Sequence, residues 1–179
     1  MTRPPGPPEQ AWLGIVSGEH ARHAVNQAMI QINHGKRHNL ARMHRGDGFV
    51  FYSPTQRRGG ATPLRAFTAL GVIADDEPYQ ADEVMNMGSH GILRPWRRRV
   101  DFLSVRPLDL RDVTYQLRLT QDRHWGYRLR LGCIPLAVED FQVLYGAMAA
   151  APGTRHADRE GPAVRVPRPS WSNPPLFGP

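Results

Sequence analysis

The first fifty residues show a change of apolar spacing that predicts a strand followed by a helix. Apolar residues fill positions 11–16, the length of a short buried strand. Ser17 follows as a helix N-cap, with Glu19 in the first helical turn. The next apolar residues are spaced by three and four, as on one face of a helix: Ala21, Ala24, Val25, Ala28, Met29 and Ile32. We expect this helix to end at 33–35, where Gly35 can close it.

Short apolar runs separated by turns predict strands in the middle of the chain. A second, shorter helix is expected over 39–43, and a turn over 45–48. An aromatic strand over 49–52 ends at Ser53-Pro54, and a strand rich in β-branched residues follows over 66–74. The polar, glycine-bearing segment between these two strands is predicted to be a loop.

The second half of the chain predicts further strands and one clear helix. Apolar and basic residues roughly alternate over 92–105, as in a half-exposed strand with a basic outer face, and alternate more weakly over 115–119 and 127–131. The last helix has its apolar residues along one side: Leu136, Phe141, Leu144, Tyr145 and Met148. The order does not repeat a strand–helix–strand unit. We therefore expect an α+β fold, a mixed and mainly antiparallel barrel-like sheet flanked by helices.

Proline marks the boundaries of the predicted domain. Of the 17 prolines, four lie in residues 1–10 and seven in residues 152–179. Segments of this composition have no periodic face to bury. We expect a disordered N-terminal arm over 1–10, one domain over 11–151 and a Pro/Gly-rich tail over 152–179.

Composition and charge narrow the function classes. The 179 residues carry a formal net charge of +7, with Lys36 the one lysine beside 22 arginines. A basic chain favours polyanions such as nucleic acid as partners, although a genome whose codons favour arginine also explains the arginine count. Cys133 is the one cysteine, which excludes an internal disulfide and metal sites built on paired thiolates. No run of about 18 apolar residues and no signal sequence is visible, so we expect a cytoplasmic protein without a membrane partner.

The sequence shows no standard catalytic signature. It has no phosphate loop, no HExxH and no GxGxxG motif. The segment around Ser17 does not match the GxSxG pattern of hydrolases, and N-capping explains this serine. His34, His38 and His44 have no carboxylate or thiol that completes a metal site. No cofactor, no metal and no enzymatic activity are therefore expected.

Aromatic residues next to polar ones stand at the ends of several predicted elements. Trp12, Tyr52-Ser53, Trp96 and Trp125 are placed in this way. Aromatic walls with a few fixed polar groups suit a planar heterocycle, because the rings stack on a base while polar groups read its edge. The alternative is that these tryptophans fill the core.

Several separated motifs occur in an order that resembles a known family. They are Trp12 with Val16-Ser17-Gly18-Glu19-His20, Gln31-Ile32-Asn33-His34-Gly35-Lys36, Arg45-Gly46-Asp47 with Tyr52-Ser53-Pro54, Pro95-Trp96-Arg97 with Val100-Asp101-Phe102, Trp125-Gly126-Tyr127 with Arg130 and Gly132, and Asp140-Phe141 with Ala147-Met148. Over residues 11–149 the chain resembles EVE-domain proteins of the PUA-like superfamily, which are related to YTH domains. The resemblance implies a PUA-like pseudo-barrel whose pocket accepts modified bases in DNA or RNA. The loop at 57–60 departs from the family pattern.

These observations predict a non-enzymatic module that binds DNA or RNA and takes a modified base into an aromatic pocket. The candidate ligand-binding residues are Trp12, Ser17, Asn33, His34, Tyr52, Ser53, Trp96 and Trp125. The candidate contacts to the phosphates are Lys36, Arg94, Arg97 and Arg98. We expect a monomer, and a separate effector such as a nuclease would have to be another protein.

Two alternatives come from other function classes. One is an enzyme that acts on a nucleotide or a small anion, with Ser17, His20 or His34 as general acid or base. The other is a sensor that binds a free nucleoside or a carboxylate. Chemical turnover would separate the enzyme from the binding module, and a strong salt dependence would separate the binding module from the sensor.

Overall fold

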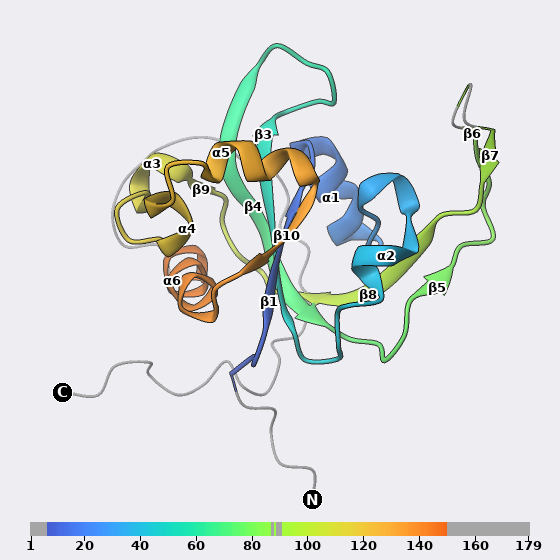
Figure 1. The fold of residues 1–179 in the computed structure, drawn as a ribbon, viewed down its shortest axis with the longest axis horizontal. Coiled ribbons are helices and arrows are strands. Elements are labelled where there is room, and N and C mark those ends of the chain that lie inside the picture. Colours follow the sequence, from blue (N-terminus) through green and yellow to red (C-terminus); the bar gives the residue numbers. More distant parts are fainter. Residues whose placement is uncertain (1–6, 87, 89–90, 150–179) are drawn as a thin grey trace, which may run out of the picture.

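A curled, eight-stranded sheet forms the centre of the molecule (Figure 1). The computed structural model describes residues 7–86, 88 and 91–149, so most of the predicted N-terminal arm and all of the predicted tail lie outside the described residues. In sheet order the main strands are β10 (Cys133–Leu136), β1 (Ala11–Ile15), β3 (Gly48–Thr55), β4 (Pro63–Ile73), β8 (Trp96–Phe102) and β2 (Met29–Ile30). Strand β1 runs parallel to β3, and the other strand pairings of the described residues are antiparallel.

Among the described residues, four further short strands and eight helical segments complete the fold. Strand β5 (Tyr79–Gln80) pairs with β8, and β9 (Leu108–Asp109) pairs with β4. Strands β6 (Met85–Asn86) and β7 (Ile92–Leu93) form a separate ribbon that projects from the body (Figure 1). The helices are α1 (Gly18–Asn26), η1 (Asn33–Gly35), α2 (Arg37–Leu40), α3 (Leu110–Val113), α4 (Arg118–Gln121), α5 (Trp125–Arg128), η3 (Leu129–Leu131) and α6 (Val138–Ala149). The predicted α+β class with a mixed, mainly antiparallel sheet is confirmed.

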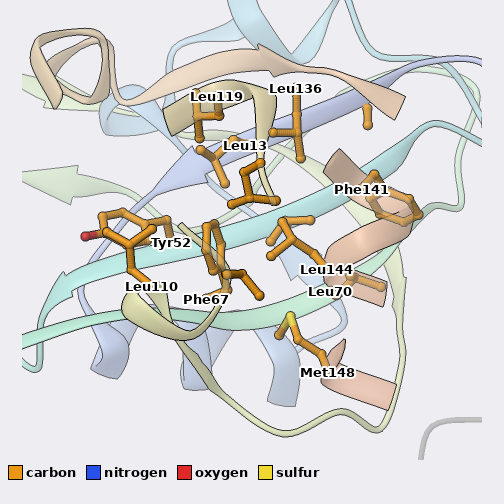
Figure 2. Packing of buried hydrophobic residues seen from close by; sticks show 14 of the residues in the cluster. Leu13, Tyr52, Phe67, Leu70, Leu110, Leu119, Leu136, Phe141, Leu144 and Met148 are labelled. Carbon is orange, nitrogen blue, oxygen red and sulfur yellow. The ribbon is translucent and has the colours of Figure 1, made fainter. Parts of the chain in front are cut away.

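Helices cover both faces of the sheet, so the domain has two cores. Because side chains alternate along a strand, Leu13 of β1 points to one face and Trp12 to the other. The Leu13 face packs against α3, α4 and α6, where Phe141 and Leu144 lie close to Leu13 and Leu70 (Figure 2). The Trp12 face packs against α1 and α2. Cys133 of β10 is buried in this second core.

Strands β1 and β4 match their predictions closely, whereas β3 continues through Ser53-Pro54 to Thr55. The last helix is confirmed as α6, but Leu136 belongs to β10 and not to this helix. Residues 115–119 and 127–131 are not strands. The backbone N–H groups of Arg118 and Leu119 donate to the Asp140 carboxylate at 2.7 and 2.8 Å, which satisfies the first donors of α4. This partner comes from α6, 21 residues away in the case of Leu119. A cap so distant in sequence gives no local signal.

The first predicted helix is also shorter than its apolar spacing suggests. Helix α1 ends at Asn26, and Ala28 has a φ of 48°, which breaks the helical path. Met29 and Ile30 then pair with Arg99 and Arg98 as β2. Their side chains are buried, but they belong to a strand of the sheet and not to one face of a helix. The spacing therefore identified buried positions correctly but assigned them to the wrong element.

Three consecutive residues in the left-handed region follow β2. Asn33, His34 and Gly35 have φ values of 47°, 57° and 75°. Gly35 packs directly on Pro95, so that an added Cβ would lie 2.5 Å from the Pro95 Cβ atom. This close contact fixes the turn between β2 and α2.

Arg98 of β8 is fully buried beneath α2. Its Nη1 donates to the carbonyl oxygens of Leu40 and Met43 at 2.9 and 2.5 Å, and its Nε donates to Asp75 Oδ1 at 2.6 Å. Nη2 donates to the Asp75 carbonyl at 2.7 Å. Arg98 lies on the same side of β8 as Val100, which is the buried side. The prediction that Arg98 contacts phosphates is therefore wrong, because its guanidinium has no access to solvent.

We expect Arg98→Met to lower the free energy of unfolding by about 3–5 kcal/mol, because it leaves the partly buried Asp75 carboxylate and the carbonyls of Leu40 and Met43 without their donor. Arg99→Met is the matched control, since Arg99 is exposed and its substitution should cost about 1 kcal/mol or less. Urea unfolding measures both. Equal losses in the two variants would contradict the structural role of Arg98.

Gly35→Ala should destabilise the protein more than Gly46→Ala does. Both glycines have a positive φ, which costs an alanine about 1–2 kcal/mol. Only the Cβ at position 35 meets other atoms, because nothing lies within 4 Å of a Cβ at position 46. The difference between the two urea unfolding energies therefore measures the contact with Pro95. Equal energies would show that the turn moves away from Pro95 at no cost.

Candidate functional site

A cavity of about 620 Å³ opens where β1 passes into α1. Its wall is completed by the segment from β2 to η1, the end of β3 with the following loop, β6, β8 and the residues before β10. The volume falls within the range of about 300–1,000 Å³ that is usual for small-molecule sites. The polar and charged residues that line it are Ser17, His20, His23, Gln31, Asn33, His34, Thr55, Arg58, Arg97 and Arg130.

Ser17 lines the cavity as the N-cap of α1. Its Oγ accepts a hydrogen bond from the backbone N–H of His20 at 3.3 Å. The helix begins here because this hydroxyl satisfies one of its first free donors. The partner of the Ser17 hydroxyl is thus the backbone of His20. Among the described residues, neither ring nitrogen of His20 contacts this hydroxyl.

His20 is held in one tautomer by a hydrogen bond to the segment between β2 and η1. Its Nε2 lies 2.9 Å from the carbonyl oxygen of Gln31. A carbonyl oxygen only accepts, so Nε2 carries the hydrogen of the neutral ring and Nδ1 keeps a lone pair. Burial lowers the pKa of His20 below its usual value, against the hydrogen bond to Gln31, and His23 and Arg58 lower it further. The ring is therefore neutral at pH 7.

Gln31 and Arg97 form a hydrogen-bonded pair in the cavity wall. Arg97 Nε donates to Gln31 Oε1 at 3.0 Å, and Arg97 Nη2 donates to Glu83 Oε2 at 2.5 Å. The Arg97 guanidinium lowers the pKa of the Glu83 carboxyl. Gln31 Nε2 in turn lies 3.0 Å from the sulfur of Met85 in β6. One cavity wall is thus tied to the projecting β6–β7 ribbon.

Asn33 connects the left-handed turn to the segment before β10. Its Nδ2 donates to the Leu131 carbonyl at 2.8 Å, and its Oδ1 accepts from Asn39 Nδ2 at 2.8 Å. Gly132 allows this approach, because a Cβ there would lie 2.7 Å from Asn33 Nδ2. Asn33 therefore fixes the shape of the cavity rim.

The lining residues carry basic groups without an acidic one. Arg58, Arg97 and Arg130 line the cavity together with the imidazoles of His20, His23 and His34, and the described lining includes no aspartate or glutamate. Glu83 lies behind Arg97 and neutralises part of its charge. Such a concave basic surface attracts anions.

The structure brings four of the predicted site residues together: Ser17, Asn33, His34 and Arg97 all line the cavity. Arg97 is half-buried and already bonded to two side chains, so its geometry does not suit the predicted contact to a phosphate. Lys36 and Arg94 are exposed and lie outside the cavity lining.

The predicted aromatic wall is not present, because no tryptophan, tyrosine or phenylalanine is among the lining residues described. Trp12 is 3% exposed and donates from Nε1 to Asp47 Oδ2 at 2.8 Å. Tyr52 and Ser53 are buried, the latter with its Oγ 2.8 Å from Thr68 Oγ1. For Trp12 the alternative, that the tryptophans fill the core, is correct, and Tyr52 and Ser53 are buried as well.

Trp96 and Trp125 are half-buried and pack against the two cores. Arg37 lies over the Trp96 ring at 5.3 Å from its centroid. Sequence reasoning placed aromatic residues at element ends correctly, but the layered fold turns these rings toward the sheet. The cavity residues that the sequence did not single out are His23, Gln31, Arg58, Met85 and Arg130, although Gln31 and Arg130 stand within the motifs that carry the family resemblance.

The described residues include no group of three or more His, Cys, Asp or Glu side chains that could hold a metal ion. In the same part of the chain, no helix is both long and apolar enough to cross a membrane.

His20 should make the stability of the protein depend on pH. Its pKa is lower in the folded protein than the usual 6.5, so below pH 6.5 the unfolded chain binds a proton that the folded protein does not. Stability should therefore fall as the pH drops from 6.5 toward the folded pKa. Urea unfolding between pH 8 and pH 5 should show a smaller loss in His20→Gln. An unchanged pH dependence in this variant would contradict the assignment.

Comparison with known proteins identifies the family. The family model described as the EVE domain matches residues 10–147. A UPF0310 protein of Renibacterium salmoninarum is 41% identical over 139 residues, which cover 78% of this chain and 95% of that protein. A UPF0310 protein of Mycobacterium avium is 41% identical over 138 residues, covering 76% and 96% of the two chains.

The similar solved structures are more distant in sequence. The crystal structure of protein Atu2648 from Agrobacterium tumefaciens is similar with a TM-score of 0.49 at 16% identity, and covers 82% of this chain and 99% of that chain. The family model alone spans well over half of the 179 residues. The chain therefore belongs to the EVE-domain family.

Proposed function

We propose that this protein binds nucleic acid and receives one base, extruded from the strand, in the cavity beside α1. The observation that carries the proposal is the lining itself, a concave surface large enough to admit a base, with three arginines, three histidines and no described carboxylate. Cationic grooves follow the phosphate backbone, and a pocket with fixed polar groups reads a base once it has left the stack.

The rim of the cavity supports binding of a strand rather than of a base alone. Arg58 and Arg130 are exposed and border the cavity. The Arg130 guanidinium lies 5.5 Å from the ring centroid of Tyr127, whose side chain is 70% exposed. An exposed aromatic ring beside an arginine offers a surface on which a neighbouring base can stack. Lys36 and Arg94 are exposed outside the cavity lining and are candidates for contacts to more distant phosphates.

The base is a modified one in this proposal, as the likeness to EVE-domain proteins implies. In this proposal the module directs an effector protein, such as a nuclease, to the modified site. In this proposal the site recognises a base and carries out no chemical step. The Ser17 hydroxyl caps α1, and His20 Nε2 binds a backbone carbonyl.

A second candidate is a sensor for a free nucleotide or another small anion. It is favoured by one observation, namely that no aromatic side chain is found among the described residues of the lining, so stacking inside the cavity would depend on histidines. The two functions differ in salt dependence, because only a polymer releases several counterions when it binds.

A panel of fluorescently labelled single-stranded and double-stranded oligonucleotides, with and without base modifications, tests the proposal by fluorescence anisotropy at several salt concentrations. We expect binding that weakens steeply with salt and is stronger for one class of modified base. Free nucleotides at the same concentrations should compete poorly. Tight, salt-insensitive binding of the free nucleotide would favour the sensor instead.

Arg130→Ala should weaken binding to single-stranded oligonucleotides of every sequence, and should make the slope of log K against log salt shallower by about 0.7 for one lost phosphate contact. Arg111→Ala is the matched control, since it removes the same charge from α3, where the side chain is 88% exposed and ion-paired with Asp109. If both variants changed the slope equally, net charge rather than the cavity rim would determine binding.

A further inference from the structure

The amide of Gln31 has a fixed orientation in the cavity wall. Arg97 Nε, 3.0 Å away, can only donate, so the atom it contacts must be the Gln31 oxygen. The Gln31 NH₂ group therefore points the other way. Gln31 is 9% exposed, and its backbone carbonyl is held by His20. Neither the amide nor its backbone is free to turn.

The NH₂ group of Gln31 faces a weak acceptor. Its nitrogen lies 3.0 Å from the thioether sulfur of Met85, and this sulfur accepts hydrogen bonds poorly. A nearly buried donor with a poor partner gains free energy when a carbonyl oxygen replaces that partner. Met85 stands in β6 of the projecting ribbon, which pairs with β7 through two residue pairs and is not part of the main sheet. The sulfur can therefore be displaced without disturbing the core.

His20 offers the complementary group on the same wall. Its Nε2 is engaged by the Gln31 carbonyl, which leaves Nδ1 as an acceptor. Within the described residues, every fully buried side-chain nitrogen or oxygen has a hydrogen-bond partner. His20 Nδ1 has no such partner there, so it is not a fully buried atom. This atom is therefore accessible, on a ring that lines the cavity. The wall presents one donor and one acceptor from residues that are bonded to each other.

We propose that Gln31 determines specificity by donating a hydrogen bond to a carbonyl oxygen of the base. The Met85 sulfur occupies the place of this oxygen until the base enters. His20 Nδ1 accepts a hydrogen bond from the N–H group beside the carbonyl. The ligand class is then a base with a C=O group next to an N–H group, as in uracil, thymine, hypoxanthine and guanine and their modified forms. Adenine lacks the carbonyl, and cytosine lacks the N–H beside its carbonyl. This inference rests on the proposed function and defines which edge is read.

Arg97 acts in this scheme as a positioning residue. It holds the Gln31 oxygen with Nε and is itself held by Glu83, so its charge serves the orientation of the amide. Its side chain is 15% exposed, which agrees with a role behind the wall rather than on a phosphate.

Two pairs of oligonucleotide probes test directly which hydrogen-bonding edge of the base the protein recognises. Single-stranded oligonucleotides of one sequence carry a central uracil or cytosine, and a second set carries hypoxanthine or adenine, so that each pair differs in the carbonyl and the N–H. We expect the wild-type protein to prefer uracil and hypoxanthine by about tenfold or more in Kd, measured by anisotropy at low salt. Equal affinities within each pair would overturn the inference while leaving nucleic-acid binding intact.

Gln31→Glu and Met85→Leu give opposite expectations. Gln31→Glu keeps the shape and the contact to Arg97 but removes the donor, so the preference for uracil over cytosine should disappear. Met85→Leu removes the competing sulfur and should strengthen uracil binding several-fold without changing cytosine binding. Gln80→Glu is the matched control, because Gln80 is exposed in β5 outside the cavity and should leave the preference unchanged.

The outcomes separate the two levels of the proposal. Salt-dependent binding that keeps its uracil preference in Gln31→Glu would overturn the role of Gln31 alone. A Met85→Leu protein that binds uracil no better than the wild type would overturn the role of the sulfur, even if Gln31→Glu fails to fold. Absence of binding to every oligonucleotide at low salt would overturn the proposed function, and the assignment of the edge with it.

Discussion

The burial of the Arg98 guanidinium fixes the relation between α2, the segment around Asp75 and β8. A buried cation needs a partner for its charge and acceptors for its donors, and here both come from different parts of the chain. Neighbouring residues of a strand point to opposite faces, so anchoring Arg98 inward directs Arg97 outward. The pairing of Ile30 with Arg98 then brings Gln31, the next residue, beside Arg97. The cavity wall thus depends on an ion pair on the other side of the strand.

The elements predictable from sequence are those that local forces determine. Strand β1 and the start of α1 were predicted because a buried run and a capping serine are local signals. Helices α4 and α5 were not predicted from the sequence. Helix α4 depends on Asp140 of α6, and short segments with weak alternation of apolar residues carry no local preference for helix or strand. The end of α1 was misplaced because the same buried residues satisfy both a helix face and the edge of a sheet.

The candidate site was predicted in part for a similar reason. Ser17, Asn33 and His34 stand at a cap and a turn, where the chain must expose polar groups. The tryptophans were misassigned because a sheet covered on both faces has two cores to fill, and Trp12 lies in one of them. Gln31 was not singled out because a lone glutamine has no periodicity or charge signal. Its importance depends on the donor that orients it, which only the fold brings near.

The buried state of Cys133 has a practical consequence for measurements in solution. It is the one cysteine of the chain, and burial raises the pKa of its thiol to about 12. Because the thiolate is the reactive form, this sulfur is protected from alkylation and oxidation at neutral pH. A cysteine introduced on the β6–β7 ribbon would therefore be the single point of attachment for a spectroscopic label. The wild-type background needs no prior removal of thiols.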